Sequence, residues 1–308
     1  MKTLLKNISP FNNKMEMSSA LFIVKKLIAF LLCYVAGMLL AEIIVIVIHF
    51  AMGYNVLQGE MLDFQTMLLM KYYGDIIFIA VMLLYWKVVE KKSLSMIGFN
   101  KRFGSYFIGI GISVFLLAIS IGGIMILGKI ECRGIFENIN VFMLLLFVGG
   151  FIIQGAMEEV LCRGFLLHTL KEKVSLPLAV LISSAIFILP HGSSLFSGEF
   201  IYGIIGIINL FLISIIFSFL TIMQKSIWAA CGLHSFWNAI LYSVLGLNLS
   251  GNDEMSTAVF NMQSIGENIW NGGIYGIEAS VVTTVVLGAF AMVLWVCGIK
   301  RVRNNAKN

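Results

Sequence analysis

The chain has 308 residues, of which 59% are hydrophobic and only 12% are charged, and its mean hydropathy is +0.96. This is about half the charged share of an ordinary soluble domain, so the composition excludes a soluble enzyme or binding module. A net charge of +5 could suggest a nucleic-acid partner, but the basic residues stand beside apolar runs, as topology signals do. The composition therefore predicts a membrane protein whose surroundings are a lipid bilayer and not nucleic acid.

Long apolar runs predict that the chain crosses the membrane about eight times. Each span needs about 20 apolar residues, and such runs occupy residues 27–50, 66–86, 105–128, 141–170, 176–195, 200–223, 227–247 and 276–299. The first run is too long for the core of a secretory signal, which has about 7 to 15 residues. The sequence therefore predicts an all-α fold, a polytopic membrane protein built as a bundle of about eight transmembrane helices.

The charged loops predict the topology. The loops and tails on one side hold most lysines and arginines, whereas the loops on the other side hold only Lys129 and Arg133 among basic residues. Since basic loops stay in the cytoplasm, both termini are expected there, in a multi-pass protein of the cell membrane. Four segments are expected, namely a cytoplasmic N-terminal tail (1–20), three transmembrane helices (21–140), a core of four transmembrane helices (141–247), and an outer loop, last helix and basic cytoplasmic tail (248–308).

Two carboxylates and a guanidinium stand inside the fourth apolar run, at Glu158, Glu159 and Arg163. A charge at the bilayer centre costs roughly 2.5 to 3.5 kcal/mol even on lenient insertion scales, so such residues indicate a functional site. Arg163 follows Glu159 by one helical turn, which predicts an ion pair between them. That pairing leaves the Glu158 carboxylate free to face the bundle interior.

Two later runs carry matching polar residues. His191 follows Phe187 by four residues, and Pro190 between them cannot donate a backbone hydrogen bond, which predicts a kink or a free backbone acceptor in that helix. His234 and Asn238 are also four residues apart and share one helix face.

These polar residues are expected to meet in one cavity that is open to the cytoplasm. The Glu158 carboxyl and the imidazoles of His191 and His234 are predicted to lie within roughly 3 to 6 Å of one another, close enough to share a water or a metal. The small residues near the motifs, namely Gly155, Ala156, Gly232 and Ser235, are interpreted as leaving room for water. Measured along the helices from the basic edges, His191 is the deepest of the candidates.

The three motifs resemble those of a known family. Glu158-Glu159-x-x-x-Arg163, Phe187-x-x-x-His191 and His234-x-x-x-Asn238 are similar to the signatures of the CPBP family, the CAAX-prenyl-protease and bacteriocin-processing intramembrane proteases, also called Abi proteins. The resemblance implies an eight-helix bundle and peptide-bond hydrolysis within or beside the membrane. It also implies auxiliary roles for Glu159 and Arg163, and a catalytic site on four residues, namely Glu158, His191, His234 and Asn238.

The chemistry of these side chains agrees with that expectation. Peptide hydrolysis needs a base that activates a water and a donor that stabilises the oxyanion, roles that suit Glu158 and the Asn238 amide. His191 and His234 either hold the water directly, or join Glu158 in binding a divalent metal such as zinc. No cofactor is certain from the sequence, and the two mechanisms stay open.

The expected partner is a peptide or membrane-protein substrate. The short loops are typical of a bacterial member of the family, for which a leader peptide, a pheromone or a membrane-anchored segment is expected in place of a prenylated tail. Two other functions remain open. The first is a non-catalytic bacteriocin-immunity or regulatory membrane protein, which would tolerate loss of Glu158, and the second is a transporter, in which buried charges would line a pathway.

Overall fold

The computed structural model describes residues 7–196, 198–251 and 258–305, and helices dominate it. Its longest elements are α2 (Ser19–Ala51), α3 (Phe64–Val88), α4 (Gly104–Ile126), α5 (Val141–Glu159), α7 (Leu176–Ile188), α9 (Phe200–Gln224), α10 (Trp228–Ala239) and α11 (Val281–Asn305). Short helical pieces join or extend them, at Val56–Gln58, Val160–Leu167, His168–Leu170 (α6), Leu189–His191, Gly192–Leu195 (α8), Ile240–Val244, Gly273–Tyr275 and Ile277–Ala279.

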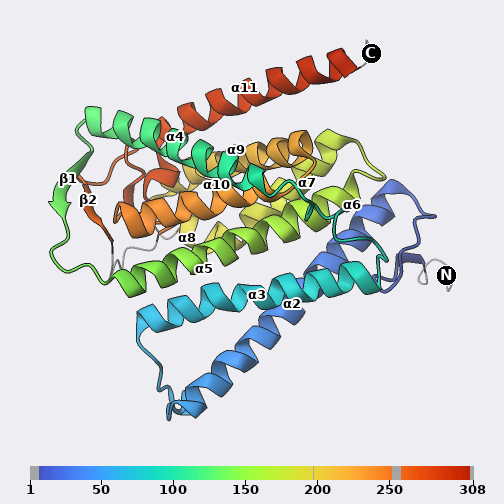
Figure 1. Ribbon diagram of the computed structural model, residues 1–308, viewed down its shortest axis with the longest axis horizontal. Coiled ribbons are helices and arrows are strands. Elements are labelled where there is room, and N and C mark those ends of the chain that lie inside the picture. The colour runs from blue at the N-terminus through green and yellow to red at the C-terminus, as the bar shows by residue number, and fades with distance from the viewer. Residues whose placement is uncertain (1–6, 197, 252–257, 306–308) are drawn as a thin grey trace.

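Seven helical segments among the described residues are long and apolar enough to cross a membrane. This confirms an all-α, multi-pass membrane protein. The run predicted at 227–247 is not among the seven, because its helix has 12 residues in α10 and 5 more in the turn that follows. Most of α10 is buried, and it packs against α4, α5 and α9 in the middle of the bundle (Figure 1).

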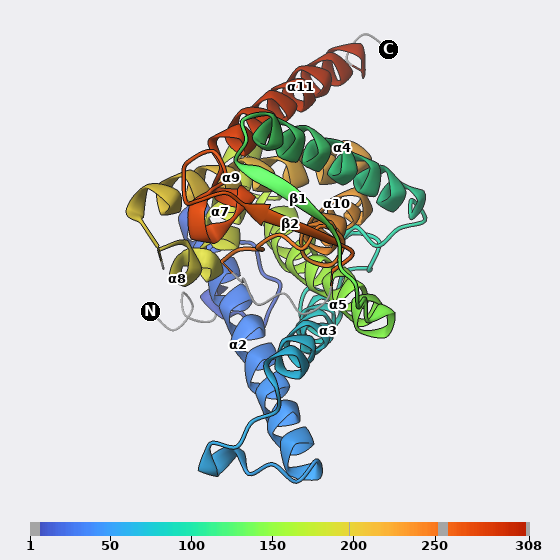
Figure 2. The ribbon, with the colours of Figure 1, turned by 90° about the vertical axis from the view of Figure 1, so that its left-hand side faces the viewer.

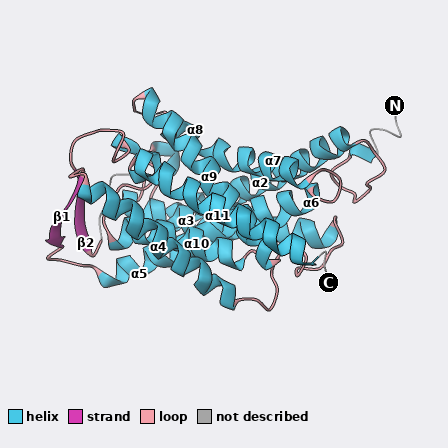
Figure 3. Ribbon diagram, turned by 90° about the horizontal axis from the view of Figure 1, so that it is seen from above, coloured by secondary structure: helices cyan, strands magenta, loops and turns pink. Residues whose placement is uncertain are grey.

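Successive long helices run back and forth along one direction, so the start of α2 and the end of α11 lie at the same end of the bundle (Figure 1). At the opposite end lie two short antiparallel strands, β1 (Ile130–Ile135) and β2 (Phe260–Ser264), in which Cys132 pairs with Met262 (Figure 2). Seen from above, this strand pair again stands apart from the helices at one end (Figure 3). The arrangement agrees with an even number of crossings.

The last predicted span, at 276–299, begins later than expected. Gly276 has a φ of 89°, which favours glycine and ends the preceding turn, and Ile277–Ala279 then form one 3-10 turn before α11 starts at Val281. The Asn271 side chain fixes this region by donating hydrogen bonds to the carbonyls of Lys129 and Gly266, at 3.2 and 2.7 Å. The segment expected to be the outer edge of a membrane helix is therefore an ordered turn.

Small residues bring the central helices into backbone contact. A Cβ built on Gly232 would lie 2.1 Å from the Tyr106 carbonyl oxygen, and one on Gly155 would lie 2.7 Å from the Ser235 Oγ. The interpretation that these glycines leave room for water is therefore wrong. They allow α10 to pack closely on α4 and α5, as small residues do between membrane helices.

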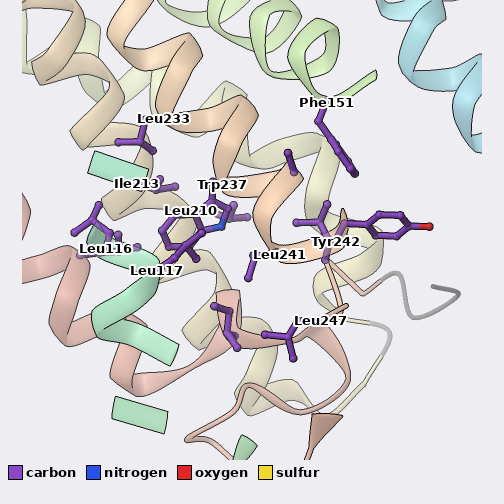
Figure 4. Packing of buried hydrophobic residues seen from close by; sticks show 14 of the residues in the cluster. Leu116, Leu117, Phe151, Leu210, Ile213, Leu233, Trp237, Leu241, Tyr242 and Leu247 are labelled. Carbon is purple, nitrogen blue, oxygen red and sulfur yellow. The ribbon is translucent and has the colours of Figure 1, made fainter. Parts of the chain in front are cut away.

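Aromatic packing fixes α5 against α10 next to the motif residues. The rings of Phe151 and Tyr242 meet edge-on with centroids 5.5 Å apart, and Figure 4 shows them side by side within the buried cluster that also includes Trp237. Phe151 precedes the first motif on α5, and Tyr242 follows the third motif beyond α10. This contact sets the relative position of the two motif helices.

Candidate active site

Both motif helices change their winding directly after the motif. The α5 helix ends at Glu159 and continues as a π-helix over Val160–Leu167, which carries Arg163. The α10 helix likewise continues as a π-turn over Ile240–Val244, just after Asn238. Such π segments are frequent at functional sites because they redirect side chains within an otherwise regular helix. The regular α spacing expected from the sequence therefore ends at the motifs.

Glu159 is fully buried and joins two motifs. Its Oε1 accepts a hydrogen bond from Arg163 Nη1 at 3.1 Å and lies 3.0 Å from His234 Nδ1. The predicted Glu159–Arg163 pair is thus confirmed, and the contact to His234 adds a partner that sequence spacing did not reveal. Its Oε2 is buried with no hydrogen-bond partner among the described residues.

The Arg163 side chain is held on several sides. Its Nη2 donates to the carbonyl oxygen and to the Oγ of Ser214 on α9, at 3.2 and 2.5 Å. The guanidinium also lies over the rings of Phe187 and Phe217, at 4.5 and 5.0 Å from the centroids. Hydrogen bonds and cation–π contacts of this kind offset the cost of burying an ion pair.

The His234 ring is oriented by its surroundings. It stacks on Phe217 at 5.0 Å between centroids and meets Phe187 edge-on at 5.9 Å. A carboxylate oxygen accepts hydrogen bonds, so the contact with Glu159 favours a proton on Nδ1, and in the neutral ring Nε2 is then an acceptor. Glu159 therefore selects the tautomer of this imidazole.

Glu158 makes different contacts from its neighbour. It is half-buried, and its Oε1 accepts a hydrogen bond from Gln154 Nε2 at 2.5 Å. The Gln154 Oε1 in turn accepts from Asn238 Nδ2 at 2.8 Å, so three side chains connect α5 to α10. Glu158 also interacts electrostatically with His234. Sequence reasoning missed Gln154, although a polar residue one turn before Glu158 in a membrane helix was a usable signal.

His191 lies in the 3-10 turn Leu189–His191, where α7 has ended at Ile188. The helix therefore changes from α to 3-10 winding at Pro190, the position where a kink or a free acceptor was predicted. The His191 Nδ1 is 3.2 Å from the Phe187 carbonyl oxygen, and its ring centroid is 5.5 Å from that of Phe187. Since Phe187 also touches His234, one aromatic ring contacts both motif imidazoles.

A central cavity of about 30 Å³ adjoins these residues, large enough for water. Its lining includes Phe187, His234 and Asn238, and the remaining lining residues are Asn209, Leu210, Ile213, Phe217, Trp237, Glu278, Thr283 and Leu287. Neither Glu158 nor His191 is among them. Glu158 is instead hydrogen-bonded to Gln154, and His191 lies beside the Phe187 carbonyl, so a single cavity shared by all the motif residues stays a prediction.

Glu278 is a carboxylate that sequence reasoning missed. Its Oε1 accepts from Trp237 Nε1 at 3.3 Å, and its Oε2 accepts from the backbone and hydroxyl of Ser250 at 2.8 and 2.7 Å. Burial raises the pKa of Glu278 above its ordinary value, with the Ser250 hydrogen bonds and His191 acting against that rise. A lone carboxylate at the start of the last apolar run was the signal for it.

A metal site can be tested against these positions. Each motif imidazole has its Nδ1 beside an oxygen, from Glu159 or from the Phe187 carbonyl, as metal-ligating histidines usually have. However, no group of three or more His, Cys, Asp or Glu side chains among the described residues is placed to hold a metal ion. Glu158, His191 and His234 do not form such a group in this structure, and a divalent metal such as zinc at these residues stays a prediction.

The comparisons with known proteins concern the same part of the chain. Residues 140–240 match the family model described as Rce1-like, type II CAAX prenyl endopeptidase Rce1-like. This segment contains all three motifs, and the match agrees with the resemblance to CAAX-type proteases of the CPBP family. Neither the curated proteins nor the solved structures gave a match to the chain.

Proposed function

We propose that this protein, whose residues 140–240 match the Rce1-like endopeptidase family, is an intramembrane endopeptidase that cleaves a membrane-associated or peptide substrate. One observation carries the proposal. The buried Glu159 fixes the tautomer of His234, whose ring lines a water-sized cavity together with Asn238. Burying a set of polar side chains around a water-sized cavity is costly inside a membrane, whereas the hydrolysis of a peptide bond requires such a set.

In the proposed reaction, Glu158 is the general base and His191 and His234 hold the water through Nε2. Glu158 removes a proton from the water while the water oxygen forms a bond to the carbonyl carbon of the substrate. The carbonyl oxygen takes the displaced electron pair. The Glu158 proton then passes to the amide nitrogen as the carbon–nitrogen bond breaks, which yields a carboxylic acid and an amine.

Asn238 is the proposed donor to the oxyanion. Its amide has two N–H groups, one of which is used by Gln154, so the second can donate to the developing charge. The proposal requires Glu158 to exchange its Gln154 partner for the water when substrate binds. Catalytic hydrogen bonds are often absent or long before the substrate arrives, so this exchange is an ordinary requirement.

Glu159 and Arg163 are proposed as positioning residues. Glu159 keeps His234 in one tautomer, and Arg163 balances the charge of Glu159 inside the bundle. We further propose that the enzyme lies in the cell membrane with both termini in the cytoplasm, where the basic loops would be retained.

The test is mass spectrometry of membrane peptides from cells that express the wild type or Glu158→Gln. The variant keeps the shape of the side chain but removes the base, so wild-type product peptides are expected to disappear while the protein accumulates normally. Glu137→Gln, at an exposed position of the loop between β1 and α5, is the matched control and is expected to behave as wild type. The same peptides from Glu158→Gln at equal abundance would exclude Glu158 as the base.

A further inference from the structure

Two adjoining hollows lie near the basic end of the bundle. The inner cavity, of about 690 Å³, is lined by Ser95, Met96, Ile97, Gly98, Arg163, Leu167, His168, Lys171, Glu172, Leu176, Thr221, Ile222, Lys225 and Ser226. The apolar groove, of about 550 Å³, is lined by Leu176, Pro177, Val180, Leu181, Phe211, Ile215, Phe219, Ile222, Gly288, Ala291, Met292 and Trp295. Leu176 and Ile222 belong to both linings, so the two hollows share a wall.

The inner cavity is positively charged. Among the described residues, neither Lys171 nor Lys225 has an ion pair or a side-chain hydrogen bond through Nζ. Glu172 is the acidic residue of this lining, and it is already paired with Lys92 at 2.5 Å. Glu172 also attracts Lys171, but neither lysine has an ion-pair partner within 4.0 Å among the described residues, so the lining keeps an excess of positive charge.

A buried donor also lies at the inner end of this cavity. Arg163 is 1% exposed, and its Nη1 and Nη2 are used by Glu159 and Ser214. Its Nε has no hydrogen-bond partner among the described residues, although Arg163 lines the cavity. The Nε atom itself is buried, so an anion bound in the cavity would be stabilised by the Arg163 charge at a distance and not by a hydrogen bond to Nε.

The apolar groove has the opposite character. Apart from the Trp295 indole, its lining has no polar side chain, and it runs between α7, α9 and α11. An extended peptide would need partners for its backbone in such a groove, whereas an acyl chain needs none. The groove therefore suits a hydrocarbon chain.

The position agrees with a lipid of one leaflet. The α6–α7 turn, which contains Lys171, lies at the end of the bundle where α2 begins, and Ser19 Oγ donates to the Lys173 carbonyl at 3.3 Å (Figure 1). Lys225 lies at the same end, since it lines the same cavity as Lys171, and its carbonyl accepts a hydrogen bond from Asn100 Nδ2 at 2.6 Å. By the distribution of basic loops this is the cytoplasmic edge of the membrane, where phosphate head groups lie.

We propose that the inner cavity and the apolar groove together bind one anionic phospholipid, with its phosphate near Lys171, Lys225 and Arg163 and an acyl chain in the groove. The shared wall at Leu176 and Ile222 joins the head-group site to the chain site. This inference concerns ligand binding and stands whether or not the chain cleaves peptides.

The experiment uses the purified full chain in detergent, with lipid binding followed by native mass spectrometry and by the thermal unfolding temperature. Phosphatidylglycerol is expected to bind and to raise the unfolding temperature, whereas phosphatidylcholine with the same acyl chains is expected to bind at least about tenfold more weakly. Inorganic phosphate at the same concentration is expected to have little effect. An equal effect of inorganic phosphate would overturn the lipid assignment and leave a simple anion site.

Matched variants test the two halves separately. Lys171→Gln with Lys225→Gln is expected to weaken phosphatidylglycerol binding about tenfold or more, whereas Lys87→Gln with Lys101→Gln removes the same charge from exposed positions outside the cavity and is expected to change little. Equal weakening in both pairs would contradict a built site.

The groove is tested by filling it. A Cβ at Gly288 meets nothing within 4 Å, so Gly288→Phe is expected to occupy the groove without a clash and to displace the lipid chain. Gly111→Phe on α4 is the control, because Gly111 also has open space but lies outside the groove. Unchanged phosphatidylglycerol binding in a folded Gly288→Phe protein would refute the proposal.

Discussion

Glu158 and Glu159 are adjacent in sequence but have different surroundings, and this separates their expected roles. Glu159 is fully buried between Arg163 and His234, whereas Glu158 is half-buried and touches Gln154. A carboxylate that is to act on a water must be able to exchange partners, and one that orients an imidazole must not. The difference between neighbours is therefore as informative as the motif itself.

Glu159→Gln is expected to reduce the amount of folded protein as well as activity. The change leaves Arg163 charged and unpaired inside the bundle, and breaking a buried pair in this way costs about 3 to 5 kcal/mol. Size-exclusion chromatography of detergent extracts measures the folded fraction, with Glu158→Gln as the control that stays folded. Normal amounts of an inactive Glu159→Gln protein would instead indicate that Glu159 contacts the reacting groups.

Glu278 is expected to make stability depend on pH. Its pKa is raised by burial, so the folded state binds a proton more tightly than the unfolded state, and stability falls as pH rises through the range above the ordinary value of 4.5. Glu278→Gln is expected to reduce this slope. Unfolding temperatures measured from about pH 4 to pH 8 check this, because the range spans the ordinary glutamate pKa and neutral pH. An unchanged slope in the variant would contradict the assignment.

At the scale of elements, hydropathy predicted most helices but not their local winding. The runs at 66–86, 105–128 and 200–223 correspond to α3, α4 and α9 within a few residues, because spanning a bilayer demands that length and composition. The π segments after Glu159 and Asn238 were not predictable from this signal. A π-turn has the same composition as an α-turn, and tertiary contacts select between them.

Only part of the candidate site was predictable, because the sequence reveals contacts within one helix but not contacts between helices. Spacing along one helix revealed the Glu159–Arg163 pair, since residues one turn apart meet regardless of the fold. The contacts of Glu159 with His234 and of Gln154 with Asn238 join different helices. Their identity depends on how α5 and α10 pack, which periodicity does not contain.

Gly232→Ala is expected to destabilise the bundle. The added Cβ would lie 2.1 Å from the Tyr106 carbonyl oxygen, so α10 must move away from α4, at a cost of about 1 to 3 kcal/mol for such overpacking. Because His234 is on the same helix, activity is expected to fall with stability. Gly111→Ala, where a Cβ meets nothing within 4 Å, is the control. Equal unfolding temperatures for the two variants would contradict the close contact.

At the scale of the whole molecule, the topology can be tested through a natural cysteine. Cys132 is an exposed free thiol in β1, and β1 lies at the end of the bundle opposite to the start of α2 (Figure 1). If the basic loops are cytoplasmic, a membrane-impermeant maleimide is expected to label Cys132 in intact cells. Cys132→Ser is the control that removes the signal. Labelling of Cys132 only after the cells are opened would reverse the proposed orientation.

Arg163 lies between the candidate active site and the inner cavity and contacts both. One side of its guanidinium holds Glu159, and through it His234, while its Nε remains unpaired at the inner cavity. A charged ligand in the inner cavity would therefore change the electrostatic environment of His234 through Arg163 and Glu159. If the proposed lipid binds there and the chain is the proposed endopeptidase, turnover measured after delipidating purification is expected to be lower than in the membrane, and added anionic lipid is expected to restore it. The content of anionic lipid in the membrane would then change the rate of peptide cleavage, although the lipid does not touch the substrate.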